Sequence, residues 1–177
     1  EILYLERVPT LYEDLAEALK KYPGSLIGTT ACLGGELSVQ TMNLINAEAT
    51  GDNKGREQAH QNIVNFVLWA KEIFGDDFYI ECAPGCSIDQ KKVNERLKSI
   101  AQAFNVKMVI GSDAHYLKKE DRYVHKAYLN SKGGEREVDD FYEFAYLQDN
   151  EEIIDNLKKS NFSEEFILEM FDNSYEI

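Results

Sequence analysis

The sequence predicts an α/β fold in which short parallel strands alternate with helices and further helices follow at the C-terminal end. Three short apolar runs, at 25–30, 78–81 and 106–110, are the predicted strands. Stretches with the periodicity of amphipathic helices lie between these runs. Alternation of this kind is typical of a parallel sheet with right-handed crossover connections. In such sheets, binding sites form beyond the carboxyl ends of the strands.

Capping and turn residues predict the elements before the second strand. Thr10 and Glu13 have capping-box spacing, which predicts a helix that starts near Thr10 and stops at Tyr22-Pro23-Gly24. The first strand leads to Gly34-Gly35, which permit a tight turn or a close approach of backbone. The polar, glycine-containing run 47–55 predicts a surface loop between two helical stretches.

Helical periodicity accounts for most of the remaining chain. The predicted helices are 57–74, 89–104, 118–131, 151–160 and 164–171. Asn150 and Ser163 are the expected N-caps of the last two helices. Gly133-Gly134 should end the helix before them, and the aromatic-rich run 140–147 reads as extended.

Composition indicates one cytoplasmic domain spanning 1–177. The chain has 177 residues and 44% hydrophobic content, enough for a single core. The sequence contains no apolar run long enough to span a membrane and no signal-peptide pattern. The chain begins with Glu1, so we expect an excised fragment of a longer protein. Three cysteines are an odd number and should be reduced thiols.

The net charge of -13 is concentrated near the C-terminus. Residues 133–177 hold 3 basic and 14 acidic residues, whereas residues 1–132 hold 16 and 18. Nucleic-acid affinity depends mainly on Lys and Arg that neutralise phosphates. The chain alone is therefore a poor candidate for strong DNA or RNA binding, and DNA contact would come through a larger protein.

The ends of the predicted strands carry side chains that could ligate a metal ion. Asp113 and His115 follow the third strand, and residues two apart in extended backbone point the same way. Cys32 follows the first strand, and Glu81 with Cys82 ends the second, four residues before Cys86. Zinc accepts carboxylate, imidazole and thiolate ligands together, so the set suits a transition metal that activates water for hydrolysis.

Structural alternatives apply to each of these residues. Asp113 could cap the following turn while His115 packs on Tyr116, and Cys32 could be an inert buried thiol. Glu81 could ligate metal, orient a ligand or form a salt bridge, and Cys82 and Cys86 could simply pack under a loop.

The polar residues away from the strand ends are expected at the surface. His60 and His125 lie on predicted helices among polar residues, and Glu36 and Glu120 read as solvent-exposed charges. The sequence has no phosphate-binding loop, nucleophile elbow or dinucleotide fingerprint.

Several segments resemble a known family in their order along the chain. They are Leu26-Ile27-Gly28-Thr29-Thr30-Ala31-Cys32-Leu33-Gly34-Gly35-Glu36, Glu72-Ile73-Phe74-Gly75-Asp76, Phe78-Tyr79-Ile80-Glu81, Val93-Asn94-Glu95, Gly111-Ser112-Asp113-Ala114-His115-Tyr116-Leu117 and Asn173-Ser174-Tyr175-Glu176-Ile177. Together they resemble the later half of the PHP (polymerase and histidinol phosphatase) domain of bacterial DNA polymerase III alpha subunits.

The resemblance implies part of a distorted (βα)7 barrel with metal ions at the carboxyl ends of its strands. Residues 1–117 would form βα barrel units, and 118–177 a helical extension leading toward the polymerase. Cys32, Asp113 and His115 fall on ligand positions of the family, which imply Zn²⁺ or Mn²⁺ in the intact domain and weak or no metal binding by this part alone. A further ligand histidine of the family aligns with Gly85, beside Cys86.

The resemblance favours a part of a bacterial or phage replicative polymerase that transfers nucleotides only as a whole protein. Its PHP region would hold metal for phosphodiester hydrolysis in proofreading, or scaffold the polymerase. The alternatives are a non-catalytic scaffold with a decayed metal site and a free-standing phosphoesterase of the histidinol phosphatase type. Expected partners are the polymerase core of the same chain, proofreading or clamp subunits, and a second copy paired through an exposed sheet edge.

Overall fold

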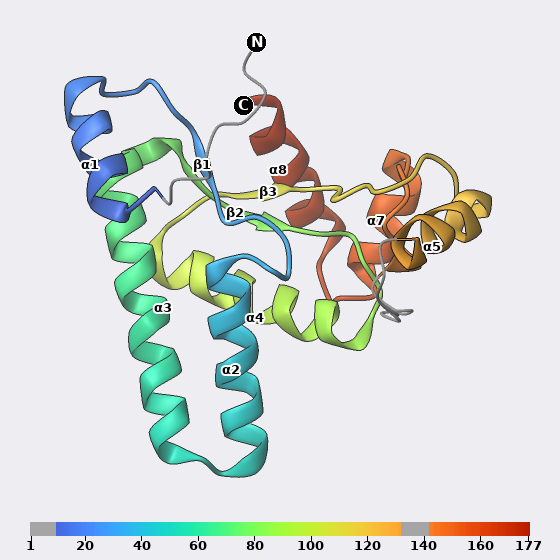
Figure 1. Cartoon of the computed structure of the whole chain (residues 1–177), viewed down its shortest axis with the longest axis horizontal. Helices are drawn as coiled ribbons and strands as arrows, with labels where there is room; N and C mark the ends of the chain where they lie inside the picture. The colour runs from blue at the N-terminus through green and yellow to red at the C-terminus, as the bar shows by residue number, and fades with distance from the viewer. Residues whose placement is uncertain (1–9, 132–141) are drawn as a thin grey trace.

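A three-stranded parallel sheet organises the molecule, as the sequence predicted. The computed structural model describes residues 10–131 and 142–177 (Figure 1). The strands are β1 (Gly28–Thr29), β2 (Phe78–Cys82) and β3 (Met108–Ile110), in the order β1-β2-β3. Gly28 lies opposite Phe78, and Ile80 lies opposite Met108. These strands do not close into a (βα)7 barrel within the described ranges, so the complete barrel stays a prediction.

Helices connect and cover the strands (Figure 1). The elements up to the third strand are α1 (Tyr12–Lys21), α2 (Glu36–Thr50), α3 (Asn53–Phe74), the 3-10 turn η1 (Gly75–Asp77) and α4 (Ile88–Phe104). Those after it are the 3-10 turn η2 (Lys119–Asp121), α5 (Arg122–Asn130), α7 (Asn150–Lys158) and α8 (Glu164–Tyr175). No helix in these ranges has both the length and the apolar character needed to cross a membrane.

The core forms where β2 meets the apolar faces of the helices. The central strand buries Phe78, Ile80 and Cys82. The helical residues packed on it recur at three- and four-residue spacing, and they are Ile63, Val67 and Ala70 of α3, Val93, Leu97 and Ala101 of α4, and Ile167 and Met170 of α8. This spacing is the periodicity from which α3 and α4 were predicted.

Side chains of α8 close the outer edge of β3. The Asn173 amide donates to the carbonyl of Met108 at 2.9 Å, and the backbone N–H of Ile110 donates to the Ser174 hydroxyl at 3.0 Å. At the opposite side of the sheet, Leu26 and Ile27 precede β1 and are about half exposed. Self-association through the β1 edge therefore stays a prediction.

The predicted loop at 47–55 is wrong, because most of it is helical. Only Gly51 and Asp52 separate α2 from α3. Gly51 has the left-handed φ of 72°, which lets α2 end within one residue. The Asp52 carboxylate then accepts the backbone N–H of Gly55 at 3.0 Å and caps α3. A glycine and a capping aspartate together make a two-residue turn, so no longer loop is needed.

Two predicted N-caps shift by one residue. The first helix is capped at Leu11 rather than Thr10, and the Leu11 N–H donates to Asp14. The cap of α7 is Asp149 rather than Asn150, and its carboxylate accepts the N–H of Glu152 while the Glu152 carboxylate accepts that of Asp149. This reciprocal capping box favours Asp149. The Ser163 cap of α8 is confirmed.

Other boundaries also differ from the predictions. The strands at 25–30 and 106–110 shorten to 28–29 and 108–110, α8 runs past 171, and the helix at 118–131 begins with a 3-10 turn. The extended run 140–147 is wrong at 142–144, where Tyr142 is helical and 143–144 form a turn, and Tyr146 bridges Tyr116. The predicted break at Gly133-Gly134 and the start of this run lie outside the described residues.

Candidate functional site at the carboxyl ends of the strands

The loops that follow β1 and β3 bring the predicted ligand residues toward one edge of the sheet. The three strands are parallel, so their carboxyl ends share that edge. Cys32 lies in the turn that joins β1 to α2. Asp113 and His115 lie in the loop that leaves β3. This topology places the three side chains near the same edge of the sheet.

Asp113 and His115 form a close pair. Nε2 of His115 lies 3.3 Å from Oδ1 of Asp113, with side-chain exposures of 38% and 26%. Asp113 has a left-handed φ of 42°, a conformation that Asp tolerates better than most residues. The backbone N–H of His115 donates to the carbonyl of Ala145 at 2.7 Å, which fixes the loop against the C-terminal part of the chain.

Cys32 also interacts with Asp113. Burial raises the pKa of the Cys32 thiol, and the negative charge of Asp113 raises it further, so the thiol is protonated at neutral pH. Oδ2 of Asp113 is buried and has no hydrogen-bond partner among the described residues. Asp113 thus interacts with both Cys32 and His115.

Glu81 ties the strands together. Its carboxylate accepts the Thr29 hydroxyl at 3.0 Å, and its backbone N–H donates to the Thr30 hydroxyl at 2.9 Å. Gly111 leaves room for this side chain, because a Cβ atom there would lie 2.0 Å from Oε1 of Glu81. The carboxylate thus fills the space above Gly111 and is engaged with β1.

The other two cysteines point into different surroundings. Cys82 has no exposed surface and belongs to the core, and burial strongly raises the pKa of its thiol. The Cys86 thiol donates to Oδ1 of Asn156 at 3.1 Å, and burial raises its pKa as well. Both thiols are protonated at neutral pH, and Cys86 contacts α7.

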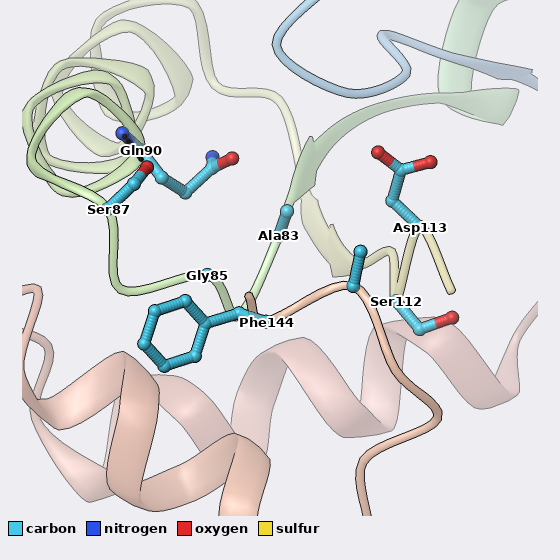
Figure 2. Close-up of a pocket in the computed structure, with 8 residues that line it drawn as sticks. Ala83, Gly85, Ser87, Gln90, Ser112, Asp113 and Phe144 are labelled. Carbon is cyan, nitrogen blue, oxygen red and sulfur yellow. Dashed lines mark hydrogen bonds between the residues drawn. The ribbon is translucent and has the colours of Figure 1, made fainter. Parts of the chain in front are cut away.

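A cavity of about 20 Å³ separates the loops that follow β2 and β3. Gly85 and Gln90 line it on one side, and Ser112 and Asp113 on the other (Figure 2). The volume corresponds to about one water molecule. A Cβ atom at Gly85 would lie 3.2 Å from Cγ of Gln90, so a larger residue at this position requires Gln90 to move.

Buried amides that the sequence reasoning missed hold the loop after β2. Asn94 is fully buried, donates to the carbonyl of Ala83 at 2.9 Å and accepts from the Gln90 amide at 2.9 Å. Asn156 donates to the Gln148 side chain at 2.8 Å, and Gln148 donates to the carbonyl of Pro84 at 3.4 Å. The only sequence signal was the position of Gln90 and Asn94 on the apolar face of α4.

The described side chains do not assemble a metal centre by themselves. Catalytic zinc sites use three protein ligands and structural sites use four. No three Cys, His, Asp or Glu side chains within 10–131 and 142–177 are placed so that they could hold one ion. The ligand roles of Cys32, Asp113 and His115 remain predictions, as do those of Glu81, Cys82 and Cys86.

The predicted surface position of His125 is wrong. Its side chain is only 8% exposed, because the rings of Tyr116, Tyr142 and His115 surround it with centroids 4.8 to 5.4 Å away. Burial lowers the pKa of His125, and the neighbouring His115 and Arg122 lower it further. The ring of His115 contacts His125 and Tyr142. The stacking partner of Tyr116 is His125 and not His115, which was the alternative for His115.

The remaining surface predictions are confirmed for His60, Glu36 and Glu120, which are all exposed. These three side chains take no part in the cluster at the strand ends. The candidate site is therefore limited to Cys32, Asp113 and His115, with Glu81 and the loop after β2 beside them.

Comparisons with known proteins show similarity to DNA polymerases. Over 150 residues, 84% of the chain, it is 45% identical to the probable DNA polymerase YorL of Bacillus subtilis strain 168 and equally to the DNA-directed DNA polymerase of Bacillus phage SPbeta. Over 109 residues, 62% of the chain, it is 38% identical to the DNA polymerase III subunit alpha of Aquifex aeolicus. No family model matches the chain. The chain spans 8% to 12% of the length of these relatives, so its homologues are DNA polymerases of which it matches a small part.

Proposed function

We propose that the chain is the later half of a PHP-type domain in a bacterial or phage polymerase of the polymerase III alpha kind, where it acts as a scaffold. The similarity to DNA polymerases supports a polymerase as the parent protein. The parallel sheet, with possible metal ligands at the carboxyl ends of its strands, supports a PHP-type domain. The parent would transfer nucleotides, and this part would contact its polymerase core and, through it, DNA.

One observation carries the scaffold role. The cavity between the two loops has Gly85 where the resemblance places a ligand histidine, and the described side chains do not gather three ligands. Asn94, Gln148 and Asn156 hold the loop after β2 by hydrogen bonds. These protein contacts therefore help to hold the loop after β2 in place.

A second candidate function, metal-assisted phosphodiester hydrolysis in the whole parent protein, rests on Asp113. Its Oδ2 atom is buried without a hydrogen-bond partner among the described residues, and it lies beside Cys32 and His115. A buried carboxylate oxygen without a partner is costly, so a cation would stabilise it. The missing ligands would have to come from other parts of the parent. A free-standing phosphoesterase is the weakest reading, because the relatives are polymerases.

Metal analysis distinguishes these functions. The full-length parent protein and its variant with alanine at the positions of Asp113 and His115 are dialysed against Zn²⁺ and, separately, Mn²⁺, and bound metal is measured by mass spectrometry. The scaffold role predicts the same amount of bound metal in both proteins. One equivalent of either metal that the variant loses would overturn it in favour of the metal-dependent role.

A further inference from the structure

A cavity of about 630 Å³ opens at the amino ends of β2 and β3, at the edge of the sheet opposite the candidate site. Its wall is formed by the end of α3, the 3-10 turn η1, the start of β2, the segment that leads into β3, and α8. Figure 1 shows α8 beside β3. The volume falls within the range of ligand-binding pockets.

The wall of this cavity carries more negative than positive charge. Its ionisable groups are the carboxylates of Asp76, Asp77, Glu169 and Glu176 and the ammonium groups of Lys71 and Lys107. Both lysines are already engaged, because Lys71 donates to the carbonyl of Phe104 and Lys107 pairs with Glu176. The carboxylates of Asp76, Asp77 and Glu169 form no hydrogen bond or ion pair within the described part of the chain. Three carboxylates are thus available to a cation.

Tyr79 adds a buried polar group to the same wall. It is only 6% exposed, and its hydroxyl has no hydrogen-bond partner among the residues that the structure describes. The hydrogen bond to Glu176 raises the pKa of Lys107, and the neighbouring Tyr79 and Asp76 raise it further. The Tyr79 hydroxyl therefore lies near the charged groups of the cavity. A polar group in such a place gains from a ligand that donates a hydrogen bond to it.

The arrangement of these groups suits an organic cation better than a metal ion. Within 10–131 and 142–177, no three acidic, histidine or cysteine side chains are placed so that they could share one ion. A guanidinium group is planar and presents several N–H donors in a fixed geometry, so it can reach separated acceptors at once. A lysine ammonium is a compact point charge and reaches fewer of them.

We infer that the cavity at the amino ends of β2 and β3 binds the guanidinium group of an arginine side chain from a protein partner. The volume is larger than one arginine side chain, which leaves room for the peptide that carries it. Arginine is also enriched in protein interfaces. The net charge of -13 would attract a basic partner to the chain as a whole. The inference is independent of the proposed function, because no residue of the candidate site lines this cavity.

Methyl NMR of the full-length parent protein tests this binding, with the Val106 methyl groups of the cavity wall as reporters. Their resonances are identified by their absence from the Val106→Ile variant. N-acetylargininamide should shift these resonances, with millimolar affinity. N-acetylcitrullinamide has nearly the same shape but no charge and should not shift them. Spermidine tests the alternative that the cavity takes a free polyamine.

Variants locate the site. Glu169→Gln removes one negative charge and Tyr79→Phe removes the hydroxyl, while each keeps the size of the side chain. Each should weaken binding of N-acetylargininamide roughly threefold or more. Glu165→Gln is the matched control, because Glu165 lies one turn earlier on α8, is exposed and is not in the cavity wall. It should leave the affinity unchanged.

Five outcomes would overturn the inference. They are equal shifts with the citrulline derivative, binding of spermidine as tight as that of the arginine derivative, no shift with any probe, unchanged affinity in both Glu169→Gln and Tyr79→Phe, and equal weakening by Glu165→Gln and Glu169→Gln.

Discussion

Replacing Asn94 with Ala should destabilise the chain far more than the loss of one amide suggests. Asn94 is fully buried at the centre of α4 and joins two partners, the carbonyl of Ala83 and the amide of Gln90, each at 2.9 Å. The variant leaves both partners buried, since Ala83 is 8% and Gln90 3% exposed.

The expected cost follows from these two groups. Each buried polar group left without a partner costs about 1–3 kcal/mol. Alanine returns up to about 0.7 kcal/mol through its higher helix propensity. The free energy of unfolding should therefore fall by roughly 1–5 kcal/mol, a large share of the 5–15 kcal/mol that is typical of a domain.

Asn65 provides a matched control for this measurement. It accepts a hydrogen bond from the Gln61 amide at 2.8 Å, with the same four-residue spacing in a helix as Asn94 and Gln90, but both residues are exposed. Asn65→Ala should change stability by about 0.5 kcal/mol or less. Urea denaturation followed by circular dichroism measures both variants. A difference between them below about 1 kcal/mol would refute the claim that buried amides hold the loop after β2.

Two further predictions concern α7 and α8. Burial and a hydrogen bond to Glu152 raise the pKa of Tyr146 to about 12, above its ordinary value of 10.0. The stability that this proton provides is full below pH 10 and is lost, by roughly 1–2 kcal/mol, as pH rises from 10 to 12. Urea denaturation at pH 9 and 11.5 tests this: the free energy of unfolding should fall less with pH in Tyr146→Phe than in the unsubstituted chain. An equal decrease in both proteins would contradict the prediction. Ser174→Ala removes the hydroxyl that accepts the Ile110 N–H at 3.0 Å, so amide hydrogen exchange at Ile110 should become at least severalfold faster. The control is Ser99→Ala, on the exposed side of α4, which should leave this exchange rate unchanged.

Local patterns in the sequence were sufficient to predict the strands, the long helices and the position of Cys32, Asp113 and His115 at one edge. The spacing of apolar residues identifies the buried faces of α3 and α4, and the carboxyl ends of parallel strands meet at the same edge of the sheet. The burial of His125 could not be predicted in this way. It depends on Tyr142, which is distant in sequence, and on Tyr116, which reaches it only through the turn after β3.

The buried amides were missed for a related reason. Gln90 and Asn94 occupy the apolar face of α4, but amide side chains usually indicate a surface position. Their burial is favourable only because the carbonyl of Ala83 lies within reach, which requires the fold of the loop between β2 and α4 to be known. Polar residues on an apolar helical face are thus ambiguous until their partners are located.

The amide contacts also explain how the loop after β2 could keep its position without a metal ion in the proposed scaffold. A metal ion commonly fixes the loops that ligate it, and losing one ligand would free the loop that carried it. Here the loop with Gly85 is held from α4 through Asn94 and from α7 through Asn156 and Gln148. Gln90 occupies the space beside Gly85, so a histidine at this position would have to displace the residue that Asn94 binds. Placing a histidine at Gly85 would therefore disturb the contacts that hold the loop.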